Sequence, residues 1–145
     1  MSESVEQSFD KPQRVVGVMA RVSNSAPEKI GDIWRRFHGE KIGDRLSGRG
    51  EDIYSVYFDY ESDEKGEYGV VVGYMLPDDA AVPDGLGEVM LAPERYEVFD
   101  VAGPLPESVW KKWAEIWNTP LRRTYRTDFD CYGADGLVKI YVGVR

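Results

Sequence analysis

The sequence has very little of the two residue types on which most metal sites depend. Cys131 is the only cysteine and His38 is the only histidine among the 145 residues. One cysteine cannot form an internal disulfide, and a zinc site would need carboxylates as its remaining ligands. No HExxH, CxxC, GxxxxGK[ST] or GxGxxG motif occurs. We therefore predict no metal site, no cofactor and no catalytic residue, and we expect that the protein is not a metalloenzyme.

Long apolar runs and an excess of basic residues are also absent. No run approaches the ~20 apolar residues of a membrane span, and the start MSESVEQSFDK lacks the features of a signal peptide. We expect a cytoplasmic protein without membrane contact. Lys and Arg number 18 against 26 Asp and Glu, which gives a net charge of −8. Such a surface repels phosphate backbones, so we expect no direct nucleic-acid binding and a slight preference for cationic ligands.

The length and composition are typical of one globular domain. Hydrophobic residues make up 42% of the chain and charged residues 30%. Residues 1–12 are polar and contain Pro12, which predicts a loose N-terminal arm. We expect residues 13–145 to form a single domain.

Hydrophobic periodicity predicts six strands and two helices within that domain. β-branched and aromatic runs predict strands, and apolar residues at helical spacing predict helices. The strands cover residues 15–22, 53–60, 68–76, 95–102, 127–132 and 137–144, and the helices cover 26–38 and 106–118. Residues 77–88 are rich in Pro, Gly and Asp and predict a linker.

The element order strand, helix, hairpin occurs twice. A shift of 79 residues takes Pro27-Glu28 to Pro106-Glu107 (106 − 27 = 79) and Trp34 to Trp113. We interpret residues 13–76 and 94–145 as two half-repeats. The predicted fold is α+β: a duplicated β-α-β-β unit forms an antiparallel sheet with two helices on one face. The halves bury their helices together and leave a central cleft, which is a common place for a ligand pocket.

Aromatic and acidic residues on the predicted strands indicate what the cleft could bind. The chain has nine tyrosines, more than a small core easily holds, and aromatic faces attract organic cations. Strand alternation places Asp128, Asp130 and Tyr132 on one face. A carboxylate in a dry cleft would need a cation to balance its charge. The alternative is that Asp130 faces solvent on an edge strand, and spacing alone leaves both interpretations open.

Several short motifs resemble the effector-binding domains of AraC-type and multidrug-sensing bacterial transcription regulators, the GyrI-like small-molecule-binding family. The likeness covers roughly residues 13–145. The residues that match the family pattern are, in chain order, Tyr96, Val98, Phe99 and Gly103-Pro104, then Trp113 and Trp117, then Asp128-Phe129-Asp130-Cys131-Tyr132, and finally the closing strand Val138-Lys139-Ile140-Tyr141-Val142.

The resemblance implies a duplicated fold whose central cleft binds amphipathic, often cationic molecules. A buried acidic residue performs this role in the family, and the matching position is Asp130. The sequence departs from the family pattern there, because Asp replaces the usual Glu and is one methylene shorter. Gly143 stands where the pattern has a proline near the end of the last strand. The chain resembles stand-alone members, because the predicted domain leaves no room for a helix-turn-helix; the resemblance thus implies a regulator protein partner or a homodimer.

The leading hypothesis is a drug-binding module that senses or sequesters a lipophilic cation. The predicted ligand-binding residues are Asp130, Tyr132, Trp110, Trp113, Tyr57 and Tyr74. One alternative is a protein-interaction inhibitor of the kind that acts on DNA gyrase. Another is a hydrolase of small electrophiles, in which Asp130 would be a general base and Tyr132 a general acid.

Overall fold

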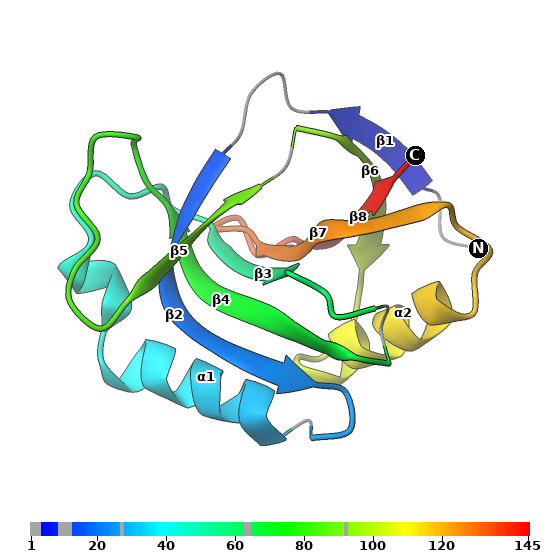
Figure 1. Cartoon of the computed structure of the whole chain (residues 1–145), viewed down its shortest axis with the longest axis horizontal. Coiled ribbons are helices and arrows are strands. Elements are labelled where there is room, and N and C mark those ends of the chain that lie inside the picture. Colours follow the sequence, from blue (N-terminus) through cyan, green and yellow to red (C-terminus); the bar gives the residue numbers. More distant parts are fainter. Residues whose placement is uncertain (1–3, 9–12, 27, 63–64, 92) are drawn as a thin grey trace.

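The computed structural model describes residues 4–8, 13–26, 28–62, 65–91 and 93–145, and all its strands belong to one eight-stranded antiparallel sheet (Figure 1). The elements are β1 (Ser4–Ser8), β2 (Gln13–Ser23), α1 (Glu28–Gly39), the 3-10 helix η1 (Ile42–Arg45), β3 (Ile53–Phe58), β4 (Glu67–Met75), β5 (Gly87–Leu91), β6 (Arg95–Val101), α2 (Glu107–Trp117), β7 (Arg123–Tyr132) and β8 (Val138–Val144). The strands lie in the order β1-β6-β8-β7-β3-β4-β2-β5.

This order confirms the predicted duplication. The first half contributes β2, α1 and the β3–β4 hairpin, and the second contributes β6, α2 and the β7–β8 hairpin. From its outer strand to the junction, the first half has the order β2-β4-β3 and the second half has the equivalent order β6-β8-β7. The halves join where β3 pairs with β7. Figure 1 shows α1 and α2 on the same side of the sheet. The α+β fold with two helices on one face was therefore predicted correctly.

Two strands lie where the sequence predicts none. β1 occupies part of the predicted loose arm and pairs with β6, from Ser4 opposite Phe99 to Ser8 opposite Arg95. β5 begins at Gly87, within the predicted linker, and pairs with β2. Both are edge strands, and an edge strand is held by backbone hydrogen bonds to one neighbour, so it needs no alternation of apolar residues. Pro12, on which the prediction of the arm relied, lies outside the described residues.

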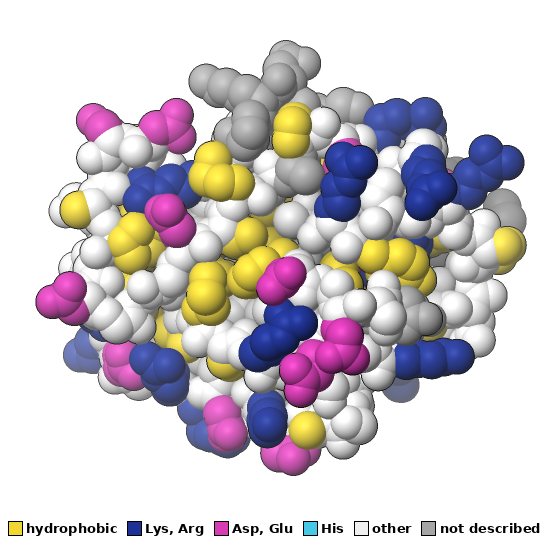
Figure 2. All heavy atoms as spheres, viewed as in Figure 1, with side chains coloured by type: hydrophobic (Ala, Val, Ile, Leu, Met, Phe, Trp, Pro, Cys, Tyr) yellow, Lys and Arg dark blue, Asp and Glu magenta, His cyan; other side chains and the backbone are white. Residues whose placement is uncertain are grey.

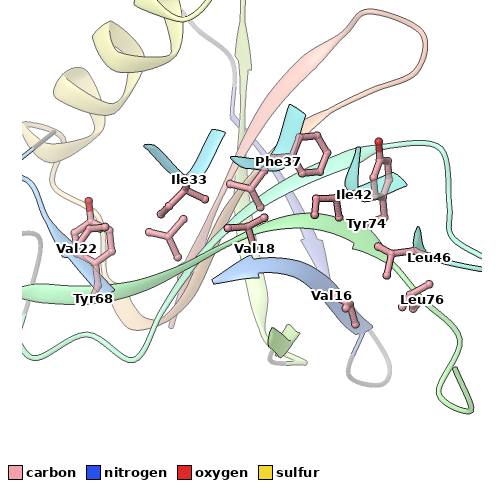
Figure 3. Packing of buried hydrophobic residues seen from close by; sticks show 12 residues of the cluster. Val16, Val18, Val22, Ile33, Phe37, Ile42, Leu46, Tyr68, Tyr74 and Leu76 are labelled. Atoms are coloured by element: carbon pink, nitrogen blue, oxygen red, sulfur yellow. The ribbon is translucent and has the colours of Figure 1, made fainter. Parts of the chain in front are cut away.

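The core beneath α1 is built from side chains that alternate along β2 and β4. Ile33 and Phe37 of α1 pack toward Val18 of β2, as Figure 3 shows, and Val16 belongs to the same cluster farther along the strand. These four side chains are almost fully buried. At about 1.5–3 kcal/mol for each buried aliphatic or aromatic side chain, this contact accounts for much of the attachment of α1.

A matching core lies beneath α2. The buried stripe of that helix consists of Val109, Trp113 and Ile116, which pack on Ile140 and Val142 of β8. The opposite face of the sheet has its own cluster, in which Phe129 of β7 stacks on Tyr141 with ring centroids 4.4 Å apart. β4 is thus buried on both faces, which explains its nearly continuous apolar sequence.

Two glycines allow an unusually close approach between β2 and β4. Gly17 and Gly73 are direct partners in the register. A β-carbon on Gly17 would lie 2.0 Å from the carbonyl oxygen of Val72, and one on Gly73 would lie 1.9 Å from that of Val16. Neither position accepts a side chain without separating the strands.

Acidic and basic side chains are interspersed on the surface in spite of the net charge. In Figure 2 they lie next to each other over much of the visible face, and hydrophobic side chains gather near its middle. Surface ion pairs include Arg14 with Glu88 and Arg36 with Glu40. Within the described residues, neither helix is long and apolar enough to cross a membrane.

Candidate functional site

The junction between the two halves places Asp130 in the middle of the sheet. β7 pairs with β3 on one side and with β8 on the other, and Asp130 lies opposite Ser55 of β3. The Asp130 side chain points to the helix face and its exposed fraction is 0%. Of the two interpretations that the sequence left open, the solvent-facing edge strand is therefore wrong, because β7 is a central strand.

Three neutral donors hold the carboxylate of Asp130. The hydroxyl of Tyr57 donates to Oδ2 at 2.6 Å, and the hydroxyl of Tyr132 donates to the same oxygen at 3.3 Å. The indole Nε1 of Trp113 donates to Oδ1 at 2.8 Å. Burial raises the pKa of Asp130 to about 6, although these hydrogen bonds to its charged form act in the opposite direction.

The surroundings of Asp130 follow the pseudo-twofold symmetry of the fold. A shift of 75 residues takes Ser55 to Asp130 and Tyr57 to Tyr132 (132 − 57 = 75). The pairing of β3 with β7 stays the same when the two strands are exchanged by this shift. Tyr57 packs edge-on against Trp113 of α2, with centroids 5.6 Å apart. Tyr132 packs edge-on against Trp34 of α1 at 5.1 Å. Two equivalent tyrosine–tryptophan pairs thus flank the Ser55–Asp130 position, and we call them the aromatic pairs.

A second buried carboxylate, Asp128, lies two residues along the same strand and has a charged partner. Nη2 of Arg123 lies 2.8 Å from its Oδ2, and the side chains of Arg123 and Asp128 are 6% and 0% exposed. The backbone N–H of Gly143 donates to Oδ1 at 2.8 Å, and the hydroxyl of Tyr60 donates to Oδ2. Burial disfavours the charge on Arg123, but the Asp128 carboxylate outweighs this effect and raises the pKa of Arg123.

The two carboxylates therefore differ in how their charge is balanced. Asp128 forms a buried ion pair with Arg123. Within the described part of the chain, no lysine or arginine forms an ion pair with Asp130, and its partners are tyrosine and tryptophan side chains alone. An ionised carboxylate without a counter-charge is costly in a protein interior, so this position favours either a proton or an external cation.

The structure brings together four of the six predicted binding residues. Tyr132, Trp113 and Tyr57 each donate a hydrogen bond to Asp130, and Tyr57 also packs against Trp113. Trp110 is 59% exposed, because the buried stripe of α2 runs through Val109, Trp113 and Ile116.

Tyr74, the sixth predicted residue, belongs to the α1 core. It lies opposite Ile53 in the register, farther along the sheet than Ser55. There its ring packs against Phe37 at 5.6 Å and beneath the guanidinium of Arg49 at 4.3 Å. The structure does not place it at Asp130.

Two features of the site were missed by the sequence interpretation. Trp34 was not among the predicted binding residues, although its position 79 residues before Trp113 is a signal for an equivalent role. The pairing of Asp128 with Arg123 carried no such signal. It depends on an irregularity in β7 between these two residues, which shifts the register and which no periodicity predicts.

The seam between the halves is open to solvent at one end. An open hollow there is lined by Asn24, Ser25, Lys65, Trp117 and Asn118, where the start of α1 faces the end of α2. Asp130 does not line this hollow. The hydroxyl of Tyr68 donates to Asn24 Oδ1, and the Tyr68 ring lies 5.9 Å from that of Tyr57. A row of side chains thus connects the rim of the hollow to the donors of Asp130.

No metal site accompanies this arrangement in the part of the chain that the structure describes. No three His, Cys, Asp or Glu side chains converge there in a way that could hold a metal ion. Chemically, the site combines one carboxylate of raised pKa with hydroxyl and indole donors and flat apolar rings. This combination is suited to holding an organic cation.

Comparison with known proteins identifies one family and several solved structures that this chain resembles. Residues 10–144 match the sequence pattern of the Cass2 family, described as integron-associated effector binding protein. A solved integron cassette protein from the mobile metagenome of Vibrio cholerae, VCH_CASS2, is 26% identical with a TM-score of 0.77, over 98% of this chain and 95% of that one. No curated protein matches the sequence.

Two further solved structures share the fold at lower identity. SAV2435 bound to tetraphenylphosphonium is 20% identical with a TM-score of 0.80, over 99% of this chain and 94% of that one. A putative transcription regulation protein from Staphylococcus aureus MU50 is 17% identical with a TM-score of 0.69, over 100% and 98% of the two chains.

Proposed function

Because the chain belongs to the family of integron-associated effector-binding proteins, we propose that it binds a small aromatic or amphipathic organic cation at Asp130, between α1 and α2. The observation that carries the proposal is the fully buried carboxylate of Asp130, which has three neutral donors. A cation placed there would supply the counter-charge that Arg123 supplies to Asp128.

The aromatic pairs supply the apolar part of the recognition. Rings of tyrosine and tryptophan present negative faces to a cation, and each desolvated cation–ring contact contributes about 2 kcal/mol. Tyr57 with Trp113, and Tyr132 with Trp34, approach Asp130 from opposite sides. A flat or tetrahedral cation with aryl groups could contact both pairs while its charge faces the carboxylate.

Binding requires the aromatic pairs to move, because they fill the space over Asp130 in this structure. Trp113 is 8% exposed and Asp130 is not exposed at all. The hollow at Trp117 offers an entry along α2, since Trp117 lies about one helical turn after Trp113. We expect a ligand to enter there and to displace the Tyr57 or Trp113 side chain from the carboxylate.

The relative SAV2435 supports a cationic ligand, since it has been solved with tetraphenylphosphonium and shares the fold over nearly the whole chain. The resemblance in sequence implies a Glu at this position in the related regulators, and the shorter side chain of Asp130 favours cations that insert deeply between the aromatic pairs.

The direct test is a tryptophan fluorescence titration with tetraphenylphosphonium. We expect saturable binding by the wild-type protein and a loss of about tenfold or more in affinity for Asp130→Asn, since a buried charge pair is removed. Asp100→Asn is the matched control, because it removes the same charge from an exposed position on β6. Equal affinities of the wild type and Asp130→Asn would contradict the proposal.

A further inference from the structure

The ion pair of Arg123 and Asp128 lies next to the proposed site. Cζ of Arg123 lies 5.8 Å from the centroid of the Trp113 ring, and the indole N–H of that same tryptophan donates to Asp130. On its other side the guanidinium lies 4.3 Å from the centroid of the Tyr125 ring. Arg123 thus packs against one wall of the site without contacting Asp130.

Among the described residues around Asp130, the space between the helices and the sheet, which we call the buried layer, holds the carboxylates of Asp128 and Asp130 and the guanidinium of Arg123. Their charges sum to a single negative charge. Asp128 and Asp130 project from the same face of β7. Successive residues on one face of a strand are about 6.5 Å apart, and at that distance charges in a protein interior still interact by about 2.5 kcal/mol. Consistent with this, the Asp128 charge contributes to the raised pKa of Asp130.

We propose that Arg123, by cancelling the charge of Asp128, keeps the net charge of the Asp130 site at minus one, and so makes the site selective for monocations over dications and over uncharged or anionic molecules of the same shape. This inference rests on the proposed function, because it concerns the ligand that Asp130 would hold. Arg123 is then a specificity-determining residue that acts through charge and not through contact with the ligand.

The first test changes Asp128 and leaves every donor of Asp130 in place. In Asp128→Asn the charge of Arg123 is no longer cancelled, and the layer becomes neutral. We expect the affinity for tetraphenylphosphonium to fall by about tenfold or more. The affinity for tetraphenylborate, an anion of the same shape, should rise relative to that for the cation.

The double variant Arg123→Gln with Asp128→Asn separates charge from structure. It lacks the ion pair but has the wild-type net charge, so we expect its affinity for tetraphenylphosphonium to lie within about threefold of the wild-type value. If the pair acted only by holding the fold, the double variant would bind as poorly as Asp128→Asn alone.

The third variant, Arg123→Gln, leaves both carboxylates without a resident cation. The probes are decyltrimethylammonium, a monocation, and decamethonium, a dication with the same alkyl chain. We expect the ratio of dication to monocation affinity to rise about tenfold over the wild-type ratio. An unchanged ratio would overturn the assignment of charge selectivity to Arg123.

Failure of this inference is distinguishable from failure of the proposed function. Wild-type protein that binds no tetraphenylphosphonium contradicts the proposed function itself. Wild-type protein that binds it, while Asp128→Asn keeps the same affinity, overturns the charge role alone. Thermal unfolding monitored by circular dichroism shows which variants fold. If either single variant does not fold, the double variant decides, and its loss of cation affinity would overturn the inference.

Discussion

Tyr57 and Tyr132 occupy equivalent positions in the two halves of the fold and donate hydrogen bonds to the same atom, Oδ2 of Asp130. Their distances to that oxygen are 2.6 Å and 3.3 Å. Burial and the nearby carboxylate raise the pKa of both hydroxyls, so they remain protonated donors at neutral pH. The group that titrates near neutrality at this point is therefore Asp130.

Cation affinity should depend on pH because a proton and a ligand compete for Asp130. The pKa of its carboxyl is raised to about 6 by burial. We expect full affinity for tetraphenylphosphonium above pH 7 and a decline below pH 6 that approaches tenfold per pH unit, the limit for one proton. Fluorescence titrations between pH 5 and 8 measure this profile. A flat profile in the wild type would exclude Asp130 as the titrating partner of the cation.

Asp130 should lower the stability of the ligand-free protein at neutral pH. Its pKa is raised in the folded state from 3.8 to about 6, so the folded protein binds a proton more tightly than the unfolded chain. The contribution of Asp130 to the free energy of unfolding is therefore favourable at low pH, and it is lost as the pH rises from about 4 to 6. We expect Asp130→Asn to raise the free energy of unfolding at pH 7 by about 1–3 kcal/mol.

Urea denaturation at pH 4.5 and pH 7 checks that expectation. The difference between Asp130→Asn and the wild type should shrink at the lower pH, where the wild-type carboxyl is largely protonated. A variant that is less stable than the wild type at pH 7 would show that the charged form of Asp130 stabilises the fold, against our interpretation.

The tryptophans of α2 should differ in their effect on binding. Trp113 donates to Asp130 at 2.8 Å and forms an aromatic pair with Tyr57, whereas Trp110 is 59% exposed. We expect Trp113→Phe to weaken tetraphenylphosphonium binding by about fivefold or more, because the face of an indole attracts a cation more strongly than that of a phenyl ring. Trp110→Phe is the matched control on the same helix and should bind like the wild type. Calorimetric titration is the suitable measurement, since both changes alter the fluorescence signal.

The glycine pair of β2 and β4 gives a prediction about stability that does not involve the site. A β-carbon at Gly73 would lie 1.9 Å from the carbonyl oxygen of Val16. We expect Gly73→Ala to separate the strands and to lower the free energy of unfolding by about 2–4 kcal/mol, which thermal unfolding would show as a lower midpoint. Gly39→Ala is the control, because nothing lies within 4 Å of a β-carbon at that position. Equal midpoints for the two variants would mean that the strands adjust at little cost.

The sequence was sufficient to predict the duplicated sheet and the position of its helices, because these depend on periodicity. Trp34 and Trp113 lie at one offset in two amphipathic helices, and both pack on the sheet. Asp130 could be placed on the same face as Tyr132 by alternation. Alternation alone does not show that this face is the buried one. That depends on which strands pair across the junction of the two halves, and strand pairing is a property of the whole chain.

The remaining features depend on long-range geometry that local patterns do not encode. β1 and β5 form because neighbouring strands offer free edges, and their own sequences give little indication. The contact between Arg123 and Asp128 needs the irregular stretch of β7. Trp110 and Trp113 are three residues apart on one helix, yet only Trp113 reaches the carboxylate, because it belongs to the buried stripe with Val109 and Ile116 and Trp110 does not.

The direct pairing of Ser55 with Asp130 bears on how such a site could arise. A homodimer of identical half-domains would place the same residue at both of these positions, since each is the symmetry mate of the other. Two aspartates there would repel each other in the interior, and two serines would carry no charge. Joining the halves in one polypeptide lets the two positions evolve separately. A lone ionisable group at the centre of an otherwise twofold arrangement is therefore closed to a homodimer of identical halves and open to two halves whose sequences differ.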